Sequence, residues 1–444
     1  MAGVYNELNQ NVGGASSISS SISLIKTIIG AGLLSMPLAY STEGIIFGTI
    51  IIIIAALTSG YGLFLQCYVS KYIPVGHATF FNLCSITYPH LSVIFDIAIA
   101  IQCFGCAVSY LVLIRDIMPG IITSLPYIKP EYYSTFWLIV SLFFTIPLSF
   151  LSNLDSLKYT SILALIAIFY MSILVVVHYF IQDIPREGII ILMPTSLTNV
   201  FSTFSIIVFA FTGHQNMFSI INEAKDKSLI NLSKLINIAI LSSSLSFIIV
   251  GLTGYLTFGS NVNGNIILSY PNGLSTTIGK LCIVFMITFS FPLMLHPARI
   301  SINNIYYWIK TNLRNKEEEE EEEEVNESTT LLNTENDETT IIKSNHFVPF
   351  SDESFKIITI SLLFIGYVLA LSVKSFALVL AIVGATGSTA ISFILPGLFG
   401  YKLIGSESAD PTILEKIFKN LSLVLTIWGV LVMFLCLYSS TILP

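Results

Sequence analysis

The sequence predicts an all-α, polytopic membrane protein with about eleven transmembrane helices. Only 11% of its 444 residues are charged, whereas a soluble globular chain carries about 25%. The apolar residues form continuous runs of roughly 20 residues, the length that crosses a hydrocarbon core of about 30 Å. Strands of a membrane barrel would instead show about ten residues of alternating character.

Each apolar run must be helical, because lipid offers no hydrogen-bond partner to an open backbone. The expected spans are 18–40, 45–69, 91–119, 134–152, 158–181, 199–221, 234–258, 274–298, 354–372, 376–401 and 417–440. The chain therefore divides into a short N-terminal segment at 1–15, spans one to eight within 16–311, an acidic segment at 312–353, and spans nine to eleven within 354–444.

Lysine and arginine are unevenly divided between the two ends of these spans. With the N-terminus in the cytosol, fourteen of the 20 basic residues lie on the cytosolic side, five lie on the other side, and Lys26 lies inside the first span. Because loops rich in lysine and arginine stay in the cytosol, we expect a cytosolic N-terminus and a C-terminus on the far side.

The acidic segment 312–353 carries the eight consecutive glutamates Glu317–Glu324. Such a run repels itself and holds too little apolar surface to fold, which predicts a disordered cytosolic loop. The segment also contains Glu327, Leu331 and Leu332, which resemble the acidic dileucine signals read by endosomal and vacuolar sorting adaptors. A sorting adaptor is therefore one expected partner.

Two expected spans carry interruptions near their middle. The first contains Gly30, Ala31 and Gly32 followed by Pro37, and the sixth contains residues 212–216, Thr-Gly-His-Gln-Asn. Glycine weakens a helix and proline removes a backbone donor. Unwound backbone at membrane depth persists where it lines a cavity or is buried in protein, and close packing through the small residues is the alternative. The breaks lie five spans apart, as two inverted five-helix repeats require.

The eighth span adds two prolines and two hydroxyl groups to this pattern. Thr288 and Ser290 precede Pro292 and Pro297. These hydroxyl oxygens could serve a polar site, but in membrane helices hydroxyls also bond back to their own helix. The sequence leaves both alternatives open.

At these three places the sequence resembles the amino acid/auxin permease family. Residues 26–37, 209–223 and 288–299 resemble the family's signatures in spans one, six and eight. Residues 95–111 are also similar to the fungal vacuolar members, which export amino acids to the cytosol. The resemblance extends over nearly the whole chain from Ser16.

This resemblance implies a fold of the LeuT type, with ten helices in two inverted repeats of five plus one further helix. The substrate would lie between the broken spans one and six. The residues implied to contact it are Gly30, Ala31, Gly32, Tyr110, Thr212, Gly213 and His214.

One residue departs from the sodium-coupled members of that family. They carry an asparagine where this chain has Lys26, and it helps to ligate sodium together with hydroxyls in span eight, where this chain has Thr288 and Ser290. An ammonium group has no acceptor and cannot ligate a cation. It could take the place of the ion, or it could titrate, and its stem could alternatively reach the cytosolic face. His214 is the second titratable candidate, because imidazole changes charge near neutral pH, although helix carbonyls could equally satisfy it.

These observations predict a secondary active transporter for mainly neutral amino acids. We expect proton-coupled, sodium-independent export from vacuole to cytosol across a vacuolar, lysosome-like membrane by alternating access. The expected partners are the amino acid and the lipid bilayer, with no nucleic acid and no cofactor besides a coupling ion, H+ in preference to Na+. The alternatives are a sodium-coupled plasma-membrane importer and an amino-acid-sensing receptor with little flux. An enzyme is not expected, because no catalytic triad, metal-ligand cluster or phosphate-binding loop occurs at suitable spacing.

Overall fold

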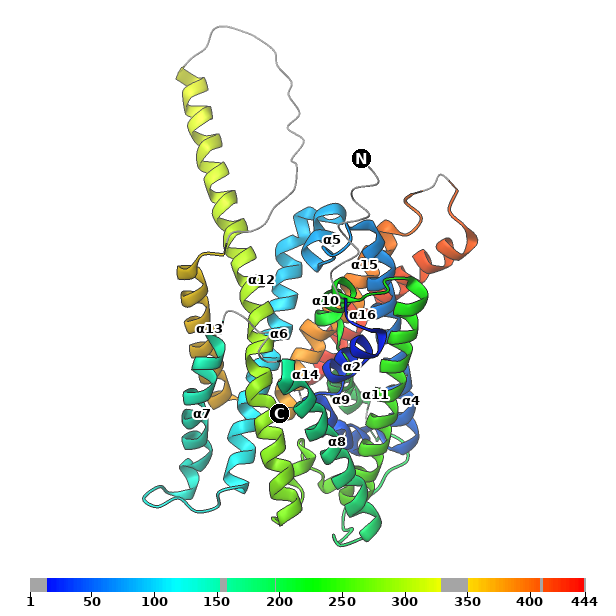
Figure 1. Ribbon diagram of the computed structural model, residues 1–444, viewed down its shortest axis with the longest axis vertical. Coiled ribbons are helices and arrows are strands. Elements are labelled where there is room, and N and C mark those ends of the chain that lie inside the picture. The colour runs from blue at the N-terminus through cyan, green and yellow to red at the C-terminus, as the bar shows by residue number, and fades with distance from the viewer. Residues whose placement is uncertain (1–13, 152–157, 196, 329–349, 408–409, 443–444) are drawn as a thin grey trace.

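The computed structural model describes residues 14–151, 158–195, 197–328, 350–407 and 410–442. In these residues the chain is a bundle of helices, as Figure 1 shows. The only β-type pairing within those ranges is an isolated bridge between Ala15 and Ala224.

The first half of the chain supplies the elements of spans one to five. They are α2 (Ser17–Ile28), η1 (Ala31–Ser35), α3 (Met36–Glu43), α4 (Ile45–Val69), η2 (Ser70–Tyr72), α5 (Phe80–Thr87), η3 (Pro89–Leu91), α6 (Ser92–Ile117), η4 (Met118–Gly120), η5 (Pro130–Tyr132), α7 (Tyr133–Ser149) and α8 (Lys158–Ile181).

The second half supplies spans six to eleven. They are α9 (Leu197–Ala210), α10 (His214–Glu223), α11 (Leu229–Phe258), η7 (Gly259–Asn261), η8 (Ile266–Leu268), α12 (Leu274–Ser328), α13 (Asp352–Ser372), α14 (Phe376–Val383), η9 (Gly384–Ser388), η10 (Ala390–Ile394), α15 (Leu395–Leu403) and α16 (Ile413–Ile442).

The predicted fold class is confirmed. In the part of the chain that the structure describes, ten helices are long and apolar enough to cross a membrane, or up to eleven when α2 and the bent helix Ala31–Glu43 count as one span. The two pieces of this first span meet at 42°. The sixth span is divided between α9 and α10, and the tenth is π-helical at η9 and η10.

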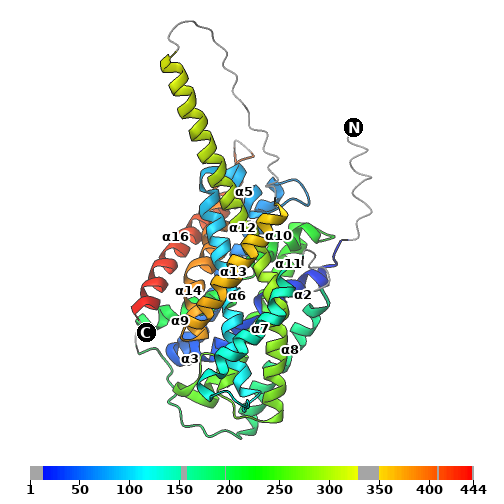
Figure 2. The same cartoon turned by 90° about the vertical axis from the view of Figure 1, so that its left-hand side faces the viewer.

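The broken spans lie inside the bundle, and lipid-facing side chains lie outside it. Helices α6 and α12 pack along each other, and α9 packs against α3, α14 and α16. Figure 2 shows α2 and α3 crossing the bundle behind α7 and α8. Phe143 and Phe169 are 78% and 68% exposed on the outer surface, as expected where lipid covers apolar side chains. We call the face at which α2 begins the inner face, and the opposite face, at which α3 ends, the far face.

The acidic segment is expected to be a disordered loop from residue 312 onward, and this expectation is wrong for its first part. Helix α12 continues to Ser328 and projects beyond the bundle as a single rod (Figure 1). Glutamate has good helix propensity, and extending an existing helix avoids the cost of nucleation. The signal residue Glu327 thus lies in the last turn of α12, whereas Leu331 and Leu332 lie outside the described residues.

Candidate functional site

A cavity of about 530 Å³ lies where the two broken spans meet. Ligand cavities for small molecules typically measure about 300–1,000 Å³, so an amino acid fits within it. Its walls come from α2, η1, α6, α8, α9, α10 and α12. Of the predicted contact residues, it is lined by Gly30, Ala31, Gly32, Tyr110 and Thr212.

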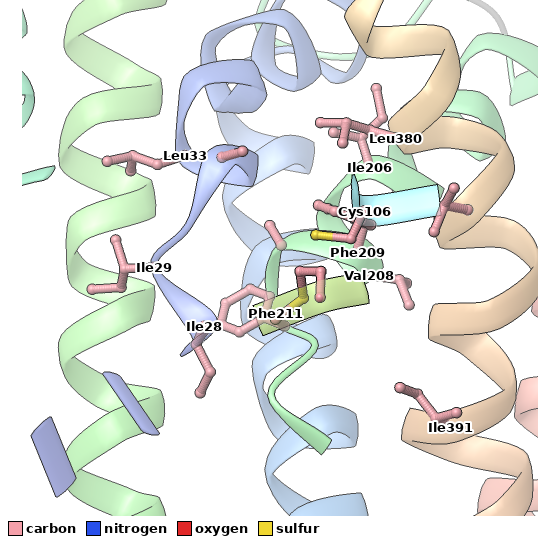
Figure 3. Close-up of a cluster of buried hydrophobic side chains, with 14 of the residues drawn as sticks. Ile28, Ile29, Leu33, Cys106, Ile206, Val208, Phe209, Phe211, Leu380 and Ile391 are labelled. Atoms are coloured by element: carbon pink, nitrogen blue, oxygen red, sulfur yellow. The ribbon is translucent and has the colours of Figure 1, made fainter. Parts of the chain in front are cut away.

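The break in span one follows directly from its sequence. Helix α2 ends at Ile28, and Gly30 adopts φ −109° and ψ −145°, far from helical values. Figure 3 shows the chain running extended past Ile29 before it coils again at Leu33. The N–H groups of Ala31 and Gly32 open the next turn, and such groups have no partner within a helix. Both residues line the cavity, so these two backbone donors belong to its wall.

Gly32 also permits the close approach of span six. A Cβ atom at this position would lie 2.6 Å from the Cβ of Ala210 and 2.8 Å from its Cα. Helix η1 thus packs directly on the end of α9. At Gly30, in contrast, an added Cβ would lie 3.9 Å from its nearest neighbour, the Thr27 carbonyl oxygen. Gly30 faces open space within the cavity.

The break in span six is held by hydrogen bonds from a hydroxyl group. Thr212 donates to the carbonyl of Val208 at 2.7 Å and accepts from the hydroxyl of Ser392 at 3.3 Å. Helix α10 starts at His214, with Gly213 as its N-cap. An added Cβ on Gly213 would lie 2.9 Å from Ile28, so this glycine lets the two breaks pack together.

His214 does not line the cavity. Its ring is fully buried against α4, where a Cβ added to Gly62 would lie 2.8 Å from Nε2. Its carbonyl accepts a hydrogen bond from Gln66 at 3.2 Å. Neither ring nitrogen has a hydrogen-bond partner in the described structure. The side chain of this predicted contact residue therefore faces away from the substrate space, and Gly213 is likewise outside the lining.

The three coupling candidates are placed differently. Lys26 and Ser290 both line the cavity, from α2 and α12. The hydroxyl of Thr288 donates to the Val284 carbonyl at 2.7 Å and lies outside the lining. Thr288 thus bonds back to its own helix, which was one of the two alternatives for this residue.

Gln102 is a lining residue that sequence reasoning did not select. Its side chain is buried in α6, and its Oε1 accepts a hydrogen bond from Ser388 at 2.6 Å. Ser388 belongs to the π-helical part of span ten, a type of irregularity found often at functional sites. A Cβ on Gly387 would lie 2.6 Å from the backbone nitrogen of Gln102. The polar Gly-Ala-Thr-Gly-Ser segment inside an apolar run was the available signal.

The cavity extends toward the inner face and is closed toward the far face. Its lining includes Ser23, Ser219 and Glu223, which are exposed. Leu33 and Leu34, which follow the break on the other side, are 2% and 4% exposed. The structure therefore describes a conformation in which the site is reached from the inner face.

The inner halves of the two broken spans are joined to each other. Asn216 of α10 donates to the hydroxyl of Thr27 in α2 at 3.2 Å. The Ala15 N–H donates to the Glu223 carbonyl at 2.8 Å, and the Lys225 N–H donates to the Ala15 carbonyl at 3.0 Å.

Among the residues with described positions, no three His, Cys, Asp or Glu side chains gather as metal ligands would.

A helical membrane bundle whose first and sixth spans break around a central cavity has the architecture of a secondary transporter. Residues 13–442 match the family model described as transmembrane amino acid transporter protein. The chain therefore belongs to this family, the amino acid/auxin permeases, as its signatures predicted.

The relatives and the fold agree with this membership. Two proteins of Saccharomyces cerevisiae are similar over nearly their full length. Vacuolar amino acid transporter 6 is 42% identical, covering 96% of this chain and 99% of that protein, and vacuolar amino acid transporter 7 is 41% identical, covering 96% and 97%. The solved structure of MhsT in complex with L-phenylalanine matches with a TM-score of 0.53 at 11% identity, covering 95% of this chain and 98% of that one. At this identity the likeness shows the fold alone, and it confirms the LeuT type.

Proposed function

We propose that this chain is a proton-coupled, sodium-independent transporter that exports mainly neutral amino acids from the vacuole to the cytosol. The observation that carries the proposal is the position of Lys26, which lines the cavity one helical turn before Gly30. An ammonium group there would take the place of a coupling cation. Because Lys26 can release and bind a proton and cannot ligate sodium, it favours coupling to protons.

The substrate's α-carboxylate would bind at the break in span one. The N–H groups of Ala31 and Gly32 point to such a role, because a helix N-terminus favours a negative charge. Thr212, Tyr110 and Gln102 would form the remaining polar contacts. Gly213 and His214 would serve the site indirectly, by setting where α10 starts, since neither lines the cavity and the His214 ring faces α4.

Alternating access would expose this site first to the far face and then to the inner face. The joined inner halves of spans one and six, α2 and α10, and the far halves, α3 and α9, would move against α6, α12, α14 and α16, which is the motion expected of this fold. One pH unit across the membrane supplies about 1.4 kcal/mol per proton. A potential of 100 mV adds about 2.3 kcal/mol per charge. An acidic vacuole can thus drive export into the cytosol.

The vacuolar assignment is supported by the two yeast relatives, which are vacuolar transporters by name. In this orientation the inner face is cytosolic, and the sequence signal formed by Glu327, Leu331 and Leu332 would be on the same side of the membrane as a sorting adaptor. Replacing both leucines by alanine in a fluorescently tagged chain is expected to shift it from the vacuolar membrane to other membranes. Unchanged vacuolar localisation would refute the sorting signal without affecting the transport proposal.

The transport proposal is tested with purified protein in sodium-free liposomes. Uptake of labelled amino acids is measured with and without an imposed pH gradient, for wild type, Lys26→Ala and Lys374→Ala. Lys374 is exposed at the far end of span nine and serves as the matched control. We expect gradient-driven uptake in wild type and the control, and its loss in Lys26→Ala. Uptake that ignores the gradient would contradict proton coupling.

Sodium coupling is the second candidate, because Ser290, which carries a hydroxyl group, lines the cavity. Replacing choline by sodium in the same liposomes discriminates between the two. Uptake that appears only with sodium would move the protein to the importer class. Substrate-dependent stabilisation without any uptake would indicate a receptor.

A further inference from the structure

Glu43 is a fully buried acidic side chain inside the first membrane span, and the transport scheme above does not use it. It is 0% exposed at the C-terminal end of α3. The turn that follows is covered by the segment before α9, because Ile45 and Ile46 donate their N–H groups to the carbonyls of Ile191 and Leu192. Glu43 therefore lies just beneath the far face, on the closed side of the cavity.

The surroundings of Glu43 do not compensate a negative charge. Its Oε1 lies 3.2 Å from the hydroxyl of Thr203, and its Oε2 has no hydrogen-bond partner in the described structure. None of the ion pairs among the described residues includes it. A buried carboxylate with one neutral donor is costly, and the low dielectric of the membrane interior makes it more so.

The hydrogen bonds fit a protonated carboxyl group better. The Thr203 hydroxyl has one hydrogen, and its neighbouring acceptors include the Thr42 hydroxyl at 2.8 Å, the Val200 carbonyl at 3.2 Å and Glu43 Oε1 at 3.2 Å. An ionised Glu43 competes with these other acceptors for the single hydrogen. A protonated Glu43 can donate to the Thr203 oxygen, so that the Thr203 hydrogen can serve one of the other acceptors. The hydrogen-bond geometry therefore favours the neutral acid.

Three elements meet at this carboxyl group, and two of them belong to the broken spans. Glu43 is in α3, and Thr203, which also bonds to Thr42 at 2.8 Å, is in α9. The titratable groups that face it are Tyr40 of the same helix and Cys436 of α16. Tyr255 of α11 stacks on Tyr40 at 6.5 Å between ring centroids, one layer further away. Glu43 thus lies where the moving half-spans meet α16.

We propose that Glu43 is a pH-sensing positioning residue that must take up a proton from the far-side solution before α3 and α9 can close against α14 and α16. The inference rests on the proposed alternating-access function. When the far side is open, water reaches the carboxylate and it ionises. When a proton binds, the neutral acid can be buried and the far side closes. An acidic lumen would then promote the conformation that releases substrate to the cytosol, and Glu43 would carry no proton across itself.

The far-side closure can be followed with an introduced cysteine. Ile206 of α9 is 2% exposed and lies beside Leu380 of α14 on the closed side of the site, as Figure 3 shows. In detergent, labelling of Ile206→Cys by a polar maleimide measures how often α9 and α14 separate. Each labelling rate is divided by the labelling rate of unfolded protein at the same pH, which removes the pH dependence of the thiol's own reactivity. Labelling of the six native cysteines, measured without Ile206→Cys, is subtracted.

The expected result is that normalised labelling of Ile206→Cys rises from pH 5 to pH 8. With Glu43→Gln added, the rise is lost and labelling stays at its pH 5 level. Glu43→Ala gives the same loss of pH dependence should the glutamine variant not be produced. Asp96→Asn is the matched control. Asp96 is a buried carboxyl group of α6 bonded to Asn304 at 3.2 Å, and its variant keeps the wild-type rise.

A rise that persists in Glu43→Gln, or no rise in Ile206→Cys alone, would overturn the proposal. Sodium-free amino acid uptake, measured in parallel on wild type, separates this outcome from a failure of the transport function. Absent uptake contradicts the proposed function whatever the labelling shows. Gradient-driven uptake in which Glu43→Gln keeps the wild-type dependence on far-side pH contradicts the role of Glu43 alone.

Discussion

The close contact between Gly32 and Ala210 makes the packing of the two broken spans testable by one added methyl group. In Gly32→Ala the new Cβ would lie 2.6 Å from the Cβ of Ala210 and 2.8 Å from its Cα. Carbon atoms pack best at about 3.5–4.0 Å, so η1 and α9 must separate by roughly 1 Å. Overpacking of this kind costs about 1–3 kcal/mol. The variant is therefore expected to lose stability, together with the geometry of the N–H groups at the break.

The assay is thermal unfolding of purified protein in detergent, with Gly30→Ala as the control. The Cβ of that variant meets nothing closer than 3.9 Å, so its Tm should equal that of wild type, while Gly32→Ala should unfold several degrees lower. Adding Ala210→Gly removes the 2.6 Å contact and leaves the one at 2.8 Å, which predicts partial recovery and a coupling energy of about 0.5–3 kcal/mol in the double-mutant cycle. Equal Tm values for Gly32→Ala and Gly30→Ala, or no recovery with Ala210→Gly, would refute this reasoning.

Three further substitutions test other contacts. Arg299 is fully buried and makes two hydrogen bonds through one guanidinium nitrogen. Arg299→Lys should therefore lose about 1.5–3 kcal/mol of stability and unfold at a lower Tm, and an unchanged Tm would contradict this. Ser388→Ala removes the hydrogen bond that holds the side chain of Gln102 in the cavity wall, so KM for uptake should rise several-fold at similar kcat. An unchanged KM would contradict a role for Gln102 in substrate binding. Thr288 bonds to its own helix, so Thr288→Ala should transport at the wild-type rate without sodium, whereas a large loss would reopen the sodium site.

The sequence was sufficient to predict the membrane spans and the positions at which spans one and six break. Continuous apolar runs fix membrane helices because the bilayer leaves the backbone no alternative. The Gly30–Gly32 segment marks its own interruption, since glycine there both weakens the helix and allows close packing. Thr212 at the second break was found for a similar reason, because polar residues in mid-span need a polar cavity or a partner.

The directions of individual side chains could not be predicted. His214 follows an irregular turn, and such a turn resets the 100° step that relates neighbouring side chains on a helix. Its ring consequently points toward α4, although Thr212 lines the cavity. The bond between Gln102 and Ser388 joins residues 286 positions apart. A pairing over such a distance leaves no local signal in one sequence.

Glu43 was missed because position along the chain was an incomplete guide to burial. It follows the first apolar run, where a charged residue is expected to reach the membrane surface. In the structure the segment containing Ile191 and Leu192 covers this turn, and the side chain is enclosed. The helical course of Glu317–Glu324 was missed for the opposite reason, since mutual repulsion was weighed without the helix that the run extends.

The central claim is that substrate binds between the breaks of spans one and six and is transported from there. The most direct measurement is amino acid uptake by Gly30→Ala in sodium-free liposomes with a pH gradient, beside substrate-dependent stabilisation of the same protein. The added methyl group projects into the cavity without touching its walls. We predict wild-type Tm with loss of both uptake and stabilisation by substrate. Wild-type uptake by this variant would contradict the proposed site.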